Sequence, residues 1–282
     1  MSVILEAKPV VQAIENDLLE EVKNLQALGR IPTLGIIRVG EKPDDLYYEN
    51  TILKKCQKLG INVQIYPLDR NVSLKEFENI LRAVNCDSSV HGILIFRPLP
   101  EQLDENRIKD LIEPAKDIDC LHSLNLAKVW EGDTSGFVPC TPAAVMEILK
   151  YYQISLEGRN AVVIGRSMVV GKPLSMMLLK ANATVTICHS KTRNLPQIAR
   201  QADILVAALG KAKFIDHTYV TENSIVIDVG INDGGDGKIC GDVDYEAVKD
   251  KVLSITPVPG GVGSVTTTIL LKHVIMACKN TL

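Results

Sequence analysis

The sequence lacks the patterns that would assign it to several large protein classes. Its formal net charge is −3, so no excess of basic residues points to nucleic acid or to an anionic membrane surface. No apolar run approaches the roughly 20 residues of a membrane-spanning helix, and the N-terminus acquires charge too early for a signal peptide. We therefore expect a soluble, cytoplasmic protein that binds neither nucleic acid nor a membrane.

The cysteines also lack a pattern. All seven are scattered, with no CxxC pair and no cluster of His and Cys at the spacing of metal ligands. An odd number at wide spacing is typical of reduced thiols in the cytosol. We expect no metal site.

The sequence does contain a regular alternation of helix and strand. In the first half, helical patterns at 8–28, 44–59 and after the capping box Ser73–Glu76 alternate with strand patterns at 33–39, 61–66 and 90–96. Such alternation predicts right-handed crossovers and a parallel sheet.

After residue 96 the regularity lapses, and a new helix begins near 140 with Thr141 as its N-cap and Pro142 in its first turn. We place the domain boundary there, giving domains 1–138 and 139–282. Further strands are predicted in the second domain at 160–165, 183–189, 202–210, 224–230 and 253–257, with a last helix over 264–279 that Ser264 caps. The fold class is α/β, with an N-terminal α/β domain and a Rossmann-like nucleotide-binding domain.

One strand–turn–helix segment, 160–179, has the character of a dinucleotide site. Gly165 allows a sharp turn, Ser167 is small, and Gly171 lets the start of the helix approach the sheet, so that backbone N–H groups would face a pyrophosphate. The standard G-x-G-x-x-G pattern is absent, because its three glycine positions hold Gly165, Ser167 and Val170. A plain turn between strand and helix stays open as the alternative.

The end of the next strand distinguishes the two nicotinamide nucleotides. An NAD-binding fold places an acidic residue there for the ribose 2′-hydroxyl, but 187–193 contains none. It contains Ser190, Lys191 and Arg193 instead, and Arg166 emerges from the neighbouring turn. Positive charge at this place favours the 2′-phosphate of NADP, with NAD possible, unless these cations belong to a solvated loop.

Three motifs together resemble one family: GRSMVVGKP (165–173), PCTP (139–142) and PVPGGVG (257–263). The chain is similar over nearly its whole length to the methylenetetrahydrofolate dehydrogenase/methenyltetrahydrofolate cyclohydrolases of one-carbon metabolism. The resemblance implies a homodimer of two-domain subunits that binds tetrahydrofolate one-carbon derivatives in the cleft between domains. It also implies that the last helix packs back on the first domain.

The resemblance places two sets of residues by position. The set expected to bind the nucleotide, together with Gly171 from the turn, is Gly165, Arg166, Ser167, Ser190 and Ile231. The set expected to bind the folate is Tyr48, Asp119, Pro259, Gly260, Gly261, Val262 and Gly263. Of these, Tyr48 and Asp119 are the candidate catalytic residues.

The sequence departs from the family at the proton-handling pair. Tyr48 matches the family tyrosine, but the position of the family lysine, four residues later, holds Ile52. In IFRPLP (95–100), Phe96 stands at the position of the family glutamine and Arg97 at that of a leucine. All three are expected to line the folate site. A third departure is Cys120, which replaces a glycine.

These departures affect the two activities differently. Oxidising the methylene group transfers a hydride and moves no proton, so positioning and a nearby negative charge suffice. Hydrolysing the methenyl cation needs an acid/base group, typically worth 10²–10⁴-fold. Lys55 is a candidate substitute on nearly the same helix face as Tyr48, about 10 Å along the axis. We therefore expect an NADP-linked dehydrogenase whose cyclohydrolase activity is reduced or uses an altered proton path.

Three alternatives stay open. The first is a fully bifunctional enzyme that forms 10-formyltetrahydrofolate. The second is a non-catalytic homologue that binds folate or nucleotide, and the third is a dehydrogenase for a different pterin carrier. Assays of both reactions with both nucleotides would separate them.

Overall fold

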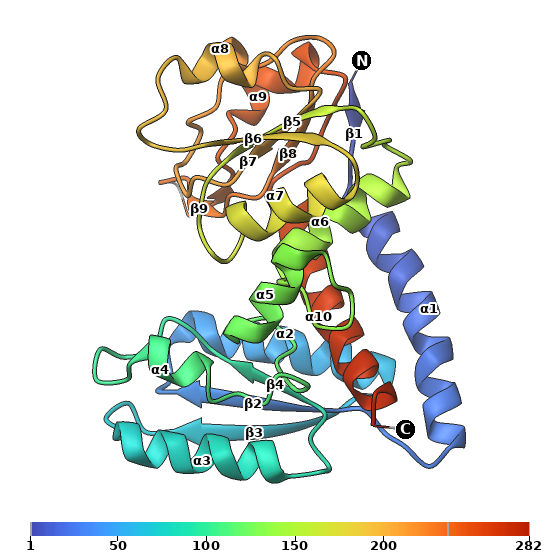
Figure 1. The fold of residues 1–282 in the computed structure, drawn as a ribbon, viewed down its shortest axis with the longest axis vertical. Coiled ribbons are helices and arrows are strands. Elements are labelled where there is room, and N and C mark those ends of the chain that lie inside the picture. Colours follow the sequence, from blue (N-terminus) through green and yellow to red (C-terminus); the bar gives the residue numbers. More distant parts are fainter. Residues whose placement is uncertain (1, 236, 282) are drawn as a thin grey trace. The chain divides into compact units, whose positions relative to one another are not determined.

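The structure, a computed structural model, describes residues 2–235 and 237–281 (Figure 1). Contacts divide the chain into two compact units. Unit 1 comprises Met1–Gln12 and Pro139–Thr266, and unit 2 comprises Ala13–Val138 and Thr267–Leu282. Helices α1 (Ala7–Ala27) and α10 (Val262–Lys279) therefore each contribute residues to both units. The larger part of α10 belongs with the N-terminal half of the chain, as expected from the resemblance.

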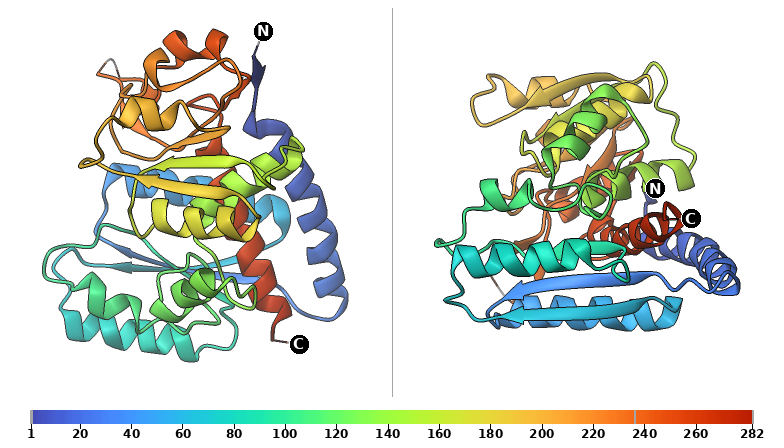
Figure 2. Two further views of the ribbon diagram at one scale, coloured as in Figure 1. Left: turned by 45° about the horizontal axis from the view of Figure 1, so that its top comes forward. Right: turned by 60° about the horizontal axis from the view of Figure 1, so that its bottom comes forward.

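Unit 2 is built on a three-stranded parallel sheet with the order β3-β2-β4. Its elements are β2 (Thr33–Val39), α2 (Pro43–Leu59), β3 (Asn62–Leu68), α3 (Leu74–Cys86), β4 (Gly92–Ile95), α4 (Glu105–Lys109) and α5 (Ser123–Glu131). Helices α2 and α3 cover opposite faces of this sheet (Figure 2). Phe77, Leu81 and Val84 of α3 pack on Ile37 and Ile95 of the strands.

Local signals explain where the helices of unit 2 begin and end. Helix α2 begins with Pro43 in its first turn and ends at Gly60, whose φ of 74° is the left-handed conformation that glycine adopts without strain. Helix α3 begins after Ser73, whose hydroxyl accepts a hydrogen bond from the Glu76 N–H at 3.2 Å. These ends agree with the sequence predictions to within one or two residues.

Unit 1 is built on a six-stranded parallel sheet with the order β1-β11-β8-β7-β5-β6. Its strands are β1 (Val3–Ile4), β5 (Asn160–Ile164), β6 (Thr184–Cys188), β7 (Ile204–Ala207), β8 (Ile225–Asp228) and β11 (Ser254–Ile255), and a small antiparallel pair joins β9 (Asn232–Asp233) to β10 (Ile239–Cys240). Its remaining helices are α6 (Cys140–Tyr151), α7 (Gly171–Lys180), α8 (Leu195–Ala199) and α9 (Tyr245–Val248), with short 3₁₀ helices over His217–Tyr219 and Lys249–Lys251.

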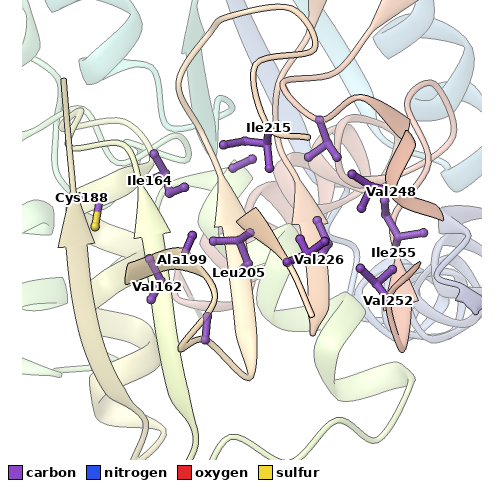
Figure 3. Packing of buried hydrophobic residues seen from close by; sticks show 14 residues of the cluster. Val162, Ile164, Cys188, Ala199, Leu205, Ile215, Val226, Val248, Val252 and Ile255 are labelled. Carbon is purple, nitrogen blue, oxygen red and sulfur yellow. The ribbon is translucent and has the colours of Figure 1, made fainter. Parts of the chain in front are cut away.

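One hydrophobic cluster of unit 1 lies along one face of this sheet, beneath α8 and α9. Figure 3 shows Val162, Leu205, Val226 and Ile255 from four neighbouring strands lying in one row of apolar side chains. Ala199 of α8 and further residues of α9 close the same cluster. Burial of this row holds the strands together, and therefore also the loops that leave their carboxyl ends. The predicted α/β class and parallel sheet are confirmed.

Two predicted helix starts were wrong. Helix α6 begins at Cys140 with Pro139 as its N-cap, so Thr141 lies inside the helix. Helix α10 begins at Val262 rather than after Ser264, because the Ser264 N–H already bonds to the Gly261 carbonyl at 3.0 Å and closes the first turn. In the part of the chain that the structure describes, no helix is both long and apolar enough to cross a membrane.

Candidate functional site

A pocket of about 460 Å³ lies in unit 1 at the carboxyl ends of β5, β6 and β7. This is the edge at which open α/β sheets bind their ligands. Its lining residues are Gly165, Arg166, Ser167, His189, Ser190, Thr192, Leu195, Ala208, Leu209, Lys211, Phe214 and Tyr219. The lining contains two basic side chains, Arg166 and Lys211, and, among the described residues, no Asp or Glu.

The turn after β5 requires its glycines. Gly165 has a φ of 146°, and a Cβ there would collide with the Ala208 carbonyl on the neighbouring loop. A Cβ on Gly171 would collide with the carbonyl of Gly165. The Ser167 hydroxyl accepts from the N–H groups of Val170 at 3.1 Å and Gly171 at 3.4 Å. Two N–H groups at the start of α7 therefore bond to Ser167.

The structure gathers only some of the predicted nucleotide residues in this pocket. Arg166 and Ser190 both line it, whereas Lys191 and Arg193 are exposed and are not among its lining residues. Sequence reasoning missed Lys211, whose ammonium lies 5.3 Å from the centre of the Phe214 ring. Its place just after the strand predicted at 202–210 is the signal that would have indicated it.

The glycine-rich loop before α10 also lies in unit 1, together with Ile231. Gly260 has a φ of 99°, and a Cβ on Gly261 would collide with the Pro257 carbonyl. A Cβ on Gly263 would lie 3.1 Å from the Ile231 side chain, which is 65% exposed. Unit 1 therefore places Ile231, which is expected to bind the nucleotide, next to the glycine-rich segment 259–263, which is expected to bind the folate.

Unit 2 brings four predicted folate residues into one cluster at the end of β4. The rings of Tyr48 and Phe96 lie 5.6 Å apart between centroids. The adjacent Arg97 lies 3.9 Å from the Asp119 carboxylate and 4.0 Å from the Glu105 carboxylate. An aromatic surface, a guanidinium and a partly exposed carboxylate are therefore close neighbours here.

Three other residues of α2 are buried or half-buried. Ile52 is 0% exposed, so its side chain lies in the core of unit 2. The Lys55 ammonium donates to the Thr268 hydroxyl on α10 at 2.9 Å, and burial lowers the pKa of Lys55. Beside Tyr48, Glu49 forms a buried ion pair with Arg38 at 2.9 Å.

The segment that carries Asp119 is fixed on both sides. Asp117 is buried and accepts hydrogen bonds from the N–H groups of residues 121 and 122 and from the amide of Asn125, at 2.8 to 2.9 Å. His273 of α10 lies 2.8 Å from the Ile118 carbonyl. The next residue after Asp119, Cys120, adopts a left-handed φ of 57°, a conformation that a glycine would take without strain.

Comparison with known proteins agrees over both units. The family model for the tetrahydrofolate dehydrogenase/cyclohydrolase catalytic domain matches residues 5–119, and the model for its NAD(P)-binding domain matches residues 139–282. The chain is 67% identical over 280 residues to "Bifunctional protein FolD 1" of Desulfitobacterium hafniense, covering 99% of this chain and 100% of that protein.

Two solved structures show the same fold. The bifunctional enzyme FolD of Campylobacter jejuni is 41% identical, with a TM-score of 0.98 and 100% of both chains covered. A Trypanosoma brucei methylenetetrahydrofolate dehydrogenase-cyclohydrolase, complexed with NADP cofactor and inhibitor, is 32% identical, with a TM-score of 0.93 and 99% and 98% of the two chains covered. The chain belongs to the tetrahydrofolate dehydrogenase/cyclohydrolase family.

Proposed function

We propose that the protein is an NADP-linked 5,10-methylenetetrahydrofolate dehydrogenase that also hydrolyses the methenyl product to 10-formyltetrahydrofolate. The observation that carries this proposal is the full-length match to relatives named as bifunctional. It favours the bifunctional alternative over the reduced cyclohydrolase expected from the sequence.

The pocket of unit 1 supports NADP as the nucleotide. Arg166 and Ser190 line it together, and among the residues that the structure describes its lining contains no acidic side chain that would hold a ribose 2′-hydroxyl. A guanidinium beside a hydroxyl suits a 2′-phosphate. When bound, NADP accepts the hydride. We expect Arg166→Ala to raise KM for NADP at least tenfold and to change KM for NAD little, in steady-state assays of both nucleotides.

The cluster of unit 2 supports the oxidation step. Loss of a hydride leaves positive charge spread over the bridging carbon and its two nitrogens, and the Asp119 carboxylate would stabilise it. The Tyr48 and Phe96 rings offer an apolar surface for the flat pterin and benzoyl groups. Absence of methylenetetrahydrofolate-dependent reduction of either nucleotide would contradict the proposal and leave the non-catalytic homologue and the dehydrogenase for a different pterin carrier.

The hydrolysis needs a group that accepts and donates a proton. The Lys55 ammonium is the candidate acid/base group, because burial lowers its pKa toward the working range. The buried Ile52 and the Phe96 ring against Tyr48 favour the second candidate function, a dehydrogenase with weak cyclohydrolase activity. Both candidates share the oxidation step and differ only in hydrolysis.

Decay of methenyltetrahydrofolate absorbance separates the two candidates. For the bifunctional enzyme we expect hydrolysis far above the buffer rate, with Lys55→Met lowering kcat about 10²-fold. Lys54→Met is the matched control, because Lys54 is exposed on the same helix. Hydrolysis at or barely above the buffer rate would favour the dehydrogenase with weak cyclohydrolase activity. We also propose a cytoplasmic homodimer, which light scattering after gel filtration and cell fractionation would test.

A further inference from the structure

Two buried aspartates lie behind the nucleotide pocket of unit 1. Asp228 ends β8 and is 3% exposed, and Asp242 follows β10 and is 0% exposed. The Asp228 carboxylate accepts hydrogen bonds from the N–H groups of Gly230, Asp242 and Val243 at 2.9 to 3.0 Å. One carboxylate therefore fixes the backbone that carries the other.

Asp242 binds the loop after β7. Its carboxylate accepts from three consecutive backbone N–H groups, those of Leu209, Gly210 and Lys211, and from the side-chain amide of Asn232, at 2.5 to 3.0 Å. Four donors thus converge on two carboxylate oxygens. Such charge-assisted bonds are about twice as strong as neutral ones.

Two glycines beside these carboxylates have no room for a side chain. A Cβ on Gly230 would collide with the Asp242 carboxylate, and a Cβ on Gly241 would collide with the Asp228 carboxylate. Each glycine thus accommodates the aspartate of the opposite segment. The loops after β7, β8 and β10 therefore form one hydrogen-bonded assembly.

We propose that Asp242, held by Asp228, is a positioning residue for the dinucleotide. Leu209 and Lys211 line the nucleotide pocket, and the backbone between them bonds to Asp242. Since these N–H groups are bound to a carboxylate, the loop presents side chains to the ligand. Asn232 joins the same carboxylate to the segment after Ile231.

This inference rests on the proposed nucleotide site but predicts a different signature. Asp242 positions a part of the pocket that NADP and NAD would both contact. Its loss should therefore weaken the binding of both nucleotides by the same factor. Arg166 acts on the 2′-phosphate, so its loss changes the NADP/NAD ratio. A residue that merely stabilised the fold would lower the melting temperature without changing either dissociation constant in the folded protein.

The test measures Kd for NADP and NAD by calorimetry on folded, full-length variants. In Asp242→Asn, the amide NH₂ must face backbone donors, and we expect both dissociation constants to rise about tenfold. Asn232→Ala removes one of four bonds without introducing a new donor, and we expect a rise of about threefold. At saturating nucleotide, kcat should change less than Kd in both variants.

Asp203→Asn is the matched control. Asp203 also accepts a backbone hydrogen bond, from Asn160 at 2.8 Å, but it lies just before β7, at the opposite end of the strand from the pocket. Its variant should bind both nucleotides like the wild type. Wild-type affinity in Asn232→Ala, or in a folded Asp242→Asn, would overturn the inference. Failure of the wild type to bind either nucleotide would instead overturn the proposed function, and the inference with it.

Discussion

The buried histidine of α10 makes the stability of the chain depend on pH in a direction that can be calculated. Burial lowers the pKa of His273 to about 4, from 6.5 when it is free. Between these values the unfolded state binds the proton and the folded state does not, so stability falls as pH decreases below 6.5. Each pH unit in this window costs about 1.4 kcal/mol, so the loss at pH 5 is about 2 kcal/mol.

The test substitution is His273→Asn. It replaces the imidazole by an amide that lies near the position of the Nδ1 atom facing the Ile118 carbonyl. The variant should be less stable than the wild type at pH 7.5, because it loses the packing of the imidazole on Phe137. The difference between the two proteins should shrink by about 2 kcal/mol at pH 5. Urea unfolding at both pH values measures it.

Comparing the wild type with His273→Asn isolates the contribution of His273 to the pH dependence of stability from contributions of opposite sign. Burial raises the pKa of Asp228 to about 6, so the folded state binds that proton first and gains stability as pH falls below 6. This contribution is the same in both proteins and cancels in their difference. His217→Asn, at an exposed histidine, is the control. A difference between wild type and His273→Asn that stays constant from pH 7.5 to pH 5 would refute the reasoning.

Three further predictions concern the turn, a buried ion pair and the thiols. Gly165→Ala should abolish nucleotide binding in calorimetry, because its methyl group collides with the Ala208 carbonyl, and retained affinity would contradict the turn geometry. Glu49→Ala leaves Arg38 buried without its carboxylate and should lower the free energy of unfolding by about 3 to 5 kcal/mol in urea, and a loss below about 1 kcal/mol would disprove this. Cys86 is exposed, whereas Cys240 is half-buried and the other five cysteines are buried, so Cys86 should account for the fast phase of labelling with a thiol reagent, and a fast phase that survives Cys86→Ser would show otherwise.

Much of the architecture could be predicted because its signals are local. Gly60 and Ser73 mark helix ends through backbone conformation and a side-chain cap, both of which depend on neighbours in sequence. The helix over Ser123–Glu131 and the β9–β10 pair were missed, because they are short and follow irregular segments. Alternation of long strands and helices predicts the sheet, while short elements depend on tertiary contacts.

Residues of the candidate site could be predicted only where they follow a strand that is recognisable from the sequence. Gly165 and Arg166 follow a recognisable strand, so their places in the pocket could be expected. Asp242 carries no local signal, because its partners at 209–211 come from a distant loop. The burial of Ile52 likewise depends on packing within unit 2, although its position four residues after Tyr48 was evident from the sequence.

The interleaved division of the chain has a consequence for its synthesis. The edge strand β1 is synthesised long before β11, the strand with which it pairs. Unit 2 in turn includes the residues from Thr267 onward, which are synthesised well after the strands of its sheet. Each unit therefore gains its full set of contacts only after a segment distant in the sequence has been synthesised. A chain cut at the 138/139 junction would yield two fragments, each lacking a segment of its own core.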